Sequence, residues 1–179
     1  LLLGENNTVL ATQQLAELSS ELSRTRANRS AATAQADSVR SALDRGAAVE
    51  SLPEVLASPL IQSLRERQVE LNAQIADLST TLLGNHPRIR ALRSQLSDLD
   101  AQIRSEANKV LAGFEAEAAT AQRREQELTA ELNRLKAASA RAEEEQVELR
   151  ALEREATAQR ELLESYLTRY REAASRSDR

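Results

Sequence analysis

The feature that most constrains this sequence is the spacing of its apolar residues, which recur at alternating steps of three and four along most of the chain. Such steps place side chains on one stripe of an α-helix, and a stripe that repeats every seven residues is typical of a coiled coil. Two polar residues, Thr25 and Arg29, interrupt the first run. The apolar members of that run are Leu15, Leu18, Leu22, Ala32, Ala36, Val39 and Leu43.

The composition argues against an ordinary compact core. The 179 residues include only three aromatic side chains, Phe114, Tyr166 and Tyr170, and no Trp, Met or Cys. Because aromatic side chains supply much of the buried area in compact domains, this chain is predicted to be elongated and helical. The absence of cysteine excludes disulfides and thiolate chemistry, and a net charge of −4 spread along the chain disfavours nucleic acid as a partner.

Helix-breaking residues predict where the first helix stops. Gly46, Pro53 and Pro59 fall close together, and proline removes a backbone donor and clashes with the preceding turn, so the helix is expected to end near residue 46. Ser58 followed by Pro59 is typical of an N-cap with proline at the first helical position. The run that follows contains Ile61, Leu64, Gln68, Leu71, Ile75, Leu78 and Leu82.

A sharp turn is predicted at Gly84, Asn85, His86 and Pro87. Gly84 is expected to adopt the left-handed conformation that closes a helix, and Pro87 to open the next one. Beyond the turn the heptad resumes with a four-residue shift at Phe114, which is typical of a stutter. Its members are Ile89, Leu92, Leu96, Leu99, Ile103, Val110, Phe114, Ala121, Leu128, Leu135, Ala142, Leu149, Ala156, Leu163 and Tyr170.

The predicted fold class is all-α, a long antiparallel coiled-coil hairpin with an interrupted first arm. Residues 1–179 are predicted to form a single elongated helical region, with a first arm over 7–46 and 58–83, a tip turn at 84–87 and a second arm over 88–172. The alternative is an up-down bundle of three or four helices. In the hairpin, the predicted core pairs are Leu82 with Ile89, Ile75 with Leu96, Ile61 with Val110, Leu43 with Leu128, Ala36 with Leu135, Leu22 with Leu149 and Leu15 with Ala156.

No residue pattern in the chain predicts catalysis, cofactor binding or a metal site. His86 is the only histidine, and the turn around it lacks the partners that a metal ion or a catalytic triad requires, so capping or turn packing is the preferred interpretation. Tyr166 and Tyr170 share a helix face with Leu163. They are predicted to pack in the seam where the helix enters a base, or to contact a neighbouring subunit.

The chain has no predicted membrane segment. The start at Leu1 has no basic region before a sustained apolar stretch, and eighteen apolar residues never occur together. If the native protein is bound to a membrane, its anchors are expected outside this segment.

Several motifs in this order resemble the periplasmic coiled-coil region of the Wzz/Wzc/GumC-like polysaccharide co-polymerases, the chain-length determinant and exopolysaccharide transport family. The resemblance covers nearly the whole chain. It depends on the His-Pro-Arg turn and on the late Leu-Glu-Arg-Glu-Ala and Tyr-Leu-x-Arg-Tyr-x-Glu patterns. These motifs occupy residues 64–67, 78–79, 86–88, 92–96, 149–156 and 166–172.

The resemblance implies a bacterial inner-membrane protein with two transmembrane helices, whose helical arm projects into the periplasm. It implies a ring-shaped homo-oligomer that sets polymer length and cooperates with an outer-membrane polysaccharide exporter and the polymerase. Some members carry a cytoplasmic tyrosine kinase domain, which would lie outside this segment. The alternatives are the coiled-coil hairpin of a membrane-fusion adaptor in a secretion system and a purely structural coiled coil.

Overall fold

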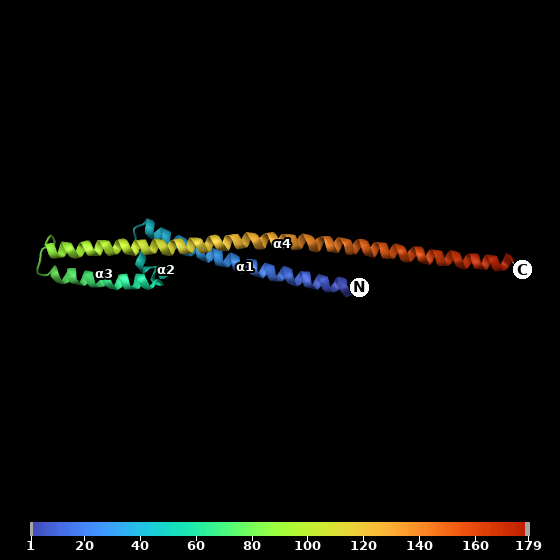
Figure 1. The fold of residues 1–179 in the computed structure, drawn as a ribbon, viewed down its shortest axis with the longest axis horizontal. Helices are drawn as coiled ribbons and strands as arrows, with labels where there is room; N and C mark the ends of the chain where they lie inside the picture. Colours follow the sequence, from blue (N-terminus) through green and yellow to red (C-terminus); the bar gives the residue numbers. More distant parts are fainter. Residues whose placement is uncertain (1, 178–179) are drawn as a thin grey trace. The chain divides into compact units, whose positions relative to one another are not determined.

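The computed structural model describes residues 2–177, and their regular secondary structure is entirely helical (Figure 1). This confirms the predicted all-α class. The contacts divide the chain into two units, which are described separately: unit 1 contains residues 1–19 and 129–179, and unit 2 contains residues 20–128. The elements are α1 (Leu2–Asp44), the short 3-10 helix η1 (Val49–Ser51), α2 (Pro53–Leu56), α3 (Pro59–Leu78) and α4 (Pro87–Ser177).

The predicted apolar stripes are the buried stripes of the helices in unit 2. On α1 the side chains of the first run between Leu22 and Leu43 are buried or half-buried, including the two polar positions Thr25 and Arg29. Every member of the second run is also at least half-buried, and all of them except Leu82 lie on α3. Ala107 of α4, with 0% of its surface exposed, was missed because the heptad was followed from Ile103 directly to Val110.

Unit 2 contains the antiparallel hairpin with an interrupted first arm. Close to the tip, Gln68 Nε2 of α3 donates a hydrogen bond to Asp100 Oδ1 of α4 at 2.9 Å. Farther from the tip, Arg26 of α1 pairs with Glu125 of α4. Partner numbers on α4 therefore rise as numbers on the first arm fall, as in an antiparallel pair. This arrangement, rather than the bundle of three or four helices, is the one observed.

The interruption between α1 and α3 begins at a left-handed glycine. Gly46 has φ of 64°, and it is the only glycine with positive φ in the part of the chain that the structure describes. The Ala47 N–H donates to the Ala42 carbonyl at 3.0 Å, and the Gly46 N–H donates to the Leu43 carbonyl at 3.2 Å. These two bonds form a Schellman motif, which satisfies carbonyls at the end of α1.

Helix α3 begins as the sequence predicted. The Ser58 side chain accepts a hydrogen bond from the Ile61 N–H at 3.4 Å, and Pro59 occupies the first helical turn. This confirms the expected N-cap followed by proline, a position where the missing proline N–H costs nothing.

The predicted left-handed cap at Gly84 is wrong, and α3 ends earlier than expected. The helix stops at Leu78, and residues 79–86 form a series of turns. The Ser79 hydroxyl donates to the Ile75 carbonyl at 2.6 Å and the Thr80 hydroxyl to the Asp77 carbonyl at 2.7 Å. These hydroxyls satisfy carbonyls at the end of the helix, so no left-handed glycine is needed there.

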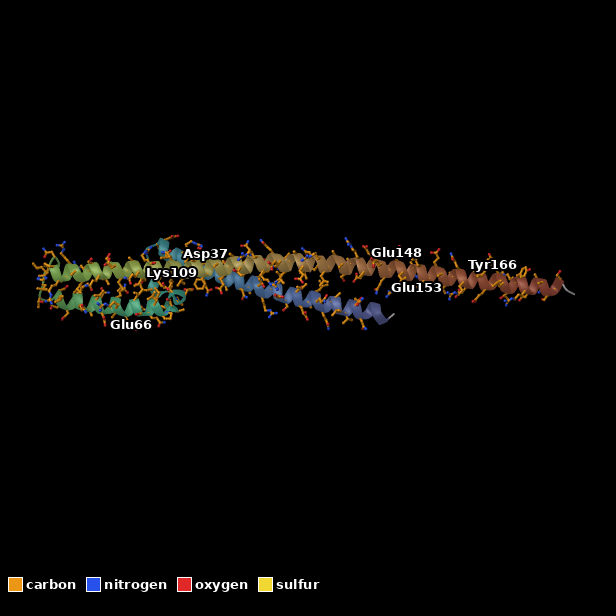
Figure 2. The ribbon with its side chains drawn as sticks, viewed as in Figure 1. Asp37, Glu66, Lys109, Glu148, Glu153 and Tyr166 are labelled. Carbon is orange, nitrogen blue, oxygen red and sulfur yellow. The ribbon has the colours of Figure 1, made fainter. Side chains whose placement is uncertain are left out.

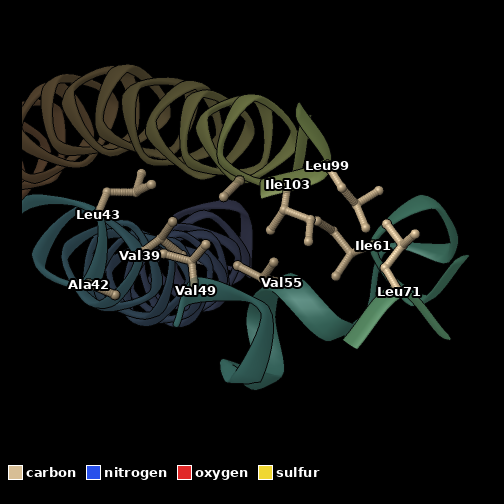
Figure 3. Close-up of a cluster of buried hydrophobic side chains, with 10 residues drawn as sticks. Val39, Ala42, Leu43, Val49, Val55, Ile61, Leu71, Leu99 and Ile103 are labelled. Atoms are coloured by element: carbon tan, nitrogen blue, oxygen red, sulfur yellow. The ribbon is translucent and has the colours of Figure 1, made fainter. Parts of the chain in front are cut away.

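The ends of α1 and α3 meet on one turn of α4. Arg104 Nη2 donates to the Leu43 carbonyl at 3.0 Å, and the Ser58 hydroxyl donates to Glu106 Oε1 at 3.3 Å. Around this turn lies the junction cluster (Figure 3), which joins residues from all five helical elements of the hairpin. Its buried members are Val39, Ala42, Leu43, Val49, Val55, Ile61, Leu71, Leu99, Ile103 and Ala107.

The predicted core pairs are wrong beyond the interruption. Leu43 was expected opposite Leu128, but its carbonyl is bonded by Arg104, which lies 24 residues earlier in α4. Closer to the tip, Ile61 shares the junction cluster with Ile103 and Ala107, and Val110, its expected partner, is not among the cluster's members.

The cause of the error is the compact fold of residues 45–58. The prediction assumed that residues 45–58 extend alongside α4. Instead they turn back on themselves through Gly46, η1 and α2. Helix α1 therefore pairs with α4 about three heptads closer to the tip than expected. A shift by whole heptads leaves every seam residue on the seam, so the repeat alone does not reveal it.

Two glycine substitutions test this description of the backbone. Gly46→Ala should lower the free energy of unfolding by about 1 kcal/mol, because an L-residue is strained at positive φ. Gly113→Ala, in the interior of α4 with open space around its position, should raise it by about 0.5–1 kcal/mol. The midpoints of urea unfolding curves measure both changes in stability, provided that the dependence of the unfolding free energy on urea concentration is unchanged. A stabilising Gly46→Ala variant would contradict the Schellman assignment.

Candidate functional site

Three places on the chain are candidates for function: a charged layer within the seam, the tip turn, and the C-terminal part of α4. None of them resembles a catalytic centre. Among residues 2–177, no three His, Asp or Glu side chains gather as they would around a metal ion. Nor does any described helix contain a stretch long and apolar enough to cross a membrane.

The charged layer consists of Arg26, Arg29 and Glu125, all within unit 2. Glu125 Oε1 lies 3.2 Å from Arg26 Nε, and Glu125 Oε2 lies 3.1 Å from Arg29 Nε. The Glu125 side chain is only 15% exposed. Arg29, which interrupted the apolar run in the sequence, thus has a counterion on α4. Glu125 was not identified from the sequence as the partner of Arg29. Its position could have been recognised, because Glu125 lies on the seam, four residues after Ala121 and three before Leu128.

The charged layer favours one register of α1 on α4 over others that differ by whole heptads, which the apolar residues alone do not distinguish. In the register with Leu43 opposite Leu128, Arg29 would face residue 142, which is an alanine. A half-buried guanidinium without a carboxylate is costly, whereas the paired arrangement satisfies both groups. A polar residue at a seam position commonly specifies the register of a coiled coil at some cost in stability.

Two more ion pairs between α1 and α4 lie at the surface of unit 2. Arg124 Nη2 is 2.6 Å from Glu21 Oε1, and the hydrogen bond to this carboxylate raises the pKa of Arg124 above its ordinary value. The hydrogen bond from Arg40 to Glu115 raises the pKa of Arg40 in the same way. Both guanidinium groups are solvent-exposed, so these pairs contribute more to alignment than to stability.

Three of the four predicted tip residues, Gly84, Asn85 and His86, lie in the turn between α3 and α4, and Pro87 begins α4. His86 Nδ1 accepts a hydrogen bond from the Arg88 N–H at 3.2 Å, which places His86 as a side-chain cap, and α4 begins at Pro87. Arg93 Nη1 donates to the Gly84 carbonyl at 3.2 Å. Asn85 is exposed. The tip is therefore closed by side-chain bonds to the backbone.

The surface of the tip is basic and partly apolar. No Asp or Glu occurs from Leu78 to Ser97, although the whole chain has 28 of them. This stretch carries Arg88, Arg90 and Arg93, all exposed. Leu83 is 79% exposed beside them. Such a surface favours contact with a partner that carries negative charge.

Tyr166 and Tyr170 lie on the C-terminal part of α4, in unit 1, where they are 58% and 73% exposed; Figure 2 labels Tyr166. The two rings are thus not packed in a seam within the described residues. Contact with a base or a neighbouring subunit remains a prediction for both of them.

Comparison with known proteins identifies the kind of chain to which these surfaces belong. No family model matches the chain, and no solved structure matches it. In an alignment of 170 positions that covers 92% of the chain, it is 30% identical to the succinoglycan biosynthesis transport protein ExoP of Rhizobium meliloti (strain 1021). The chain spans about a fifth, 22%, of the length of this relative.

This similarity supports the resemblance to the Wzz/Wzc/GumC-like co-polymerase family that the turn and the C-terminal motifs indicated.

A double-mutant cycle tests the role of the charged layer. Glu125→Leu should lower the free energy of unfolding by about 1–3 kcal/mol, because it leaves two guanidinium groups without their carboxylate. Arg29→Leu should cost less, since Arg26 still pairs with Glu125. The double variant should be about as stable as the wild type or more so, because leucine fits the seam.

Chemical denaturation measures the three variants against Glu127→Leu, a control in which an exposed glutamate of the same region is replaced. The control should change stability by no more than about 0.5 kcal/mol. Additive losses in the double variant would contradict coupling between Arg29 and Glu125.

Proposed function

We propose that this chain is the periplasmic helical arm of an inner-membrane polysaccharide co-polymerase, which contributes to polymer chain length and export by scaffolding rather than catalysis. The observation that carries the proposal is the similarity over 92% of the chain to a succinoglycan biosynthesis transport protein. A polysaccharide that passes through such an assembly would be the cargo of the whole protein, and the arm would need no cofactor.

The physical properties of the helices support a spacing role. Helix α4 contains 91 residues, and at about 1.5 Å per residue it extends roughly 135 Å. A helix of this length separates its two ends by more than the thickness of a membrane and offers long faces for lateral association. The alternative function, a membrane-fusion adaptor of a secretion system, has no comparable support, because the similar protein is named for polysaccharide transport.

The proposed partners are further copies of the same protein, the polymerase and an outer-membrane polysaccharide exporter. The basic tip with exposed Leu83 would suit an exporter surface that carries acidic groups around an apolar pocket. A cytoplasmic tyrosine kinase domain elsewhere in the full-length protein is compatible with this role.

A matched deletion tests the proposal. Because Gln68 pairs with Asp100, residues 66–72 of the first arm pair with residues 96–102 of the second, and neither segment includes the arginines of the basic tip. Removing both segments from the full-length protein shortens the arm by one heptad, about 10 Å, without moving any seam residue off the seam. The secreted polysaccharide should change in amount or modal length by at least about twofold, while synthesis of its repeat unit continues.

The controls distinguish the effect of a shorter arm from the effect of a misfolded arm. Deleting residues 66–72 alone mismatches the arms and should reduce protein level or assembly, which immunoblotting and native gels measure. If the matched deletion leaves polymer yield and length unchanged at normal protein level, this part of the arm is only a spacer. Loss of repeat-unit synthesis would point to a different function.

A further inference from the structure

The C-terminal part of α4 exposes an apolar face that no described side chain of unit 1 covers. We define the terminal apolar face as five side chains that are each between 46% and 73% exposed: Leu162, Leu163, Tyr166, Leu167 and Tyr170. Leu163, Leu167 and Tyr170 follow the three- and four-residue steps of the seam that contains Leu128, Leu132 and Leu135, and the other two flank them. Both tyrosines of the chain and three of its leucines thus contact water within nine residues.

In unit 1 the first residues of α1 pair with α4. This pairing does not extend along α4 as far as the terminal apolar face. The two helices line a shared groove of about 300 Å³, formed by Asn7, Thr8 and Ala11 of α1 and by α4 residues between Ser139 and Leu149. Lower numbers on α1 correspond to higher numbers on α4. Residues at the very start of α1 therefore lie near residue 149, and the terminal apolar face begins about thirteen residues farther along α4.

We propose that the terminal apolar face is covered by the segment of the full-length protein that immediately precedes Leu1, folded as a helix that continues the pairing of α1 with α4. Three observations favour this occupant over a second copy. The face continues the same seam and the same helix that α1 already covers. Helix α1 is regular from Leu2 onward. The similar transport protein is several times longer than this chain, so such proteins have residues available to cover it.

The register predicts which residues make the contact. Leu163 and Tyr170 lie two and three heptads beyond Leu149, so their partners stand about fourteen and twenty-one residues before Leu1. The preceding segment should carry apolar residues at these positions and at the intervening seam steps. The inference depends on the pairing within unit 1 and not on the proposed function.

Cysteine cross-linking in the full-length protein tests the proposal, with any native cysteines replaced. Leu163→Cys is combined in turn with a single cysteine at each position from about ten to eighteen residues before Leu1, and a disulfide requires Cα atoms within about 7 Å. One or two adjacent seam positions should form an intrachain disulfide on mild oxidation. Thr168→Cys, on the opposite face of α4, is the matched control and should form none with the same positions.

Two outcomes overturn the proposal. If Leu163→Cys forms disulfides only between chains, a second copy covers the face. If no upstream position reacts with it while the protein is folded and assembled, the upstream segment is not the occupant.

Hydrogen exchange of the full-length protein supplies an independent readout. Leu163→Glu should accelerate amide exchange at least about tenfold in the upstream segment, because a charge in the seam weakens its pairing. Thr168→Glu should leave exchange there unchanged. Equal exchange in both variants would contradict the contact.

Discussion

The structure of unit 2 depends on the packing of two helix ends against one turn of α4. The end of α1 and the beginning of α3 both contact the region of residues 103–107, and Ala107 is completely buried there. A methyl side chain lets helix backbones approach closely, and the branched side chains of Val55, Ile61 and Ile103 fill the space around it. The breaks in the first arm are thus compensated by a local three-dimensional core rather than by a matching break in α4.

This junction also determines where α1 lies along α4. Because residues 45–58 fold into compact turns, the end of α1 is held close to the beginning of α3, and the rest of α1 follows from there. The charged layer reinforces the same register with a different kind of interaction. Apolar contacts stabilise the pair in any register related by whole heptads, whereas the pairing of Arg29 with Glu125 satisfies only one of them.

The functional proposal agrees with the division of the chain into buried seam and exposed surfaces. The interior of unit 2 is used for packing and alignment, and the distinctive surfaces lie at the basic tip and on the C-terminal part of α4. A protein that works by holding partners at a distance requires such surfaces at the ends of stiff helices. Catalytic chemistry would instead require a cluster of polar groups shielded from water.

The sequence by itself determined the features that depend on neighbouring residues. Proline and glycine marked the interruption and the tip, Ser58 and Pro59 marked the start of α3, and the three- and four-residue steps identified the seams. Each of these follows from backbone geometry within one or two turns, so a single sequence carries the signal.

Tertiary structure decided what depends on distant residues. The register of α1 was not predictable because a seven-residue repeat defines phase but not absolute alignment. The left-handed glycine is Gly46 rather than Gly84, since hydroxyl groups at residues 79 and 80 already close α3. Ala107 and Glu125 acquire their roles only from helices that arrive from elsewhere in the chain. A small or charged residue in the sequence does not indicate which residues it will contact. Those contacts are determined by packing across the hairpin.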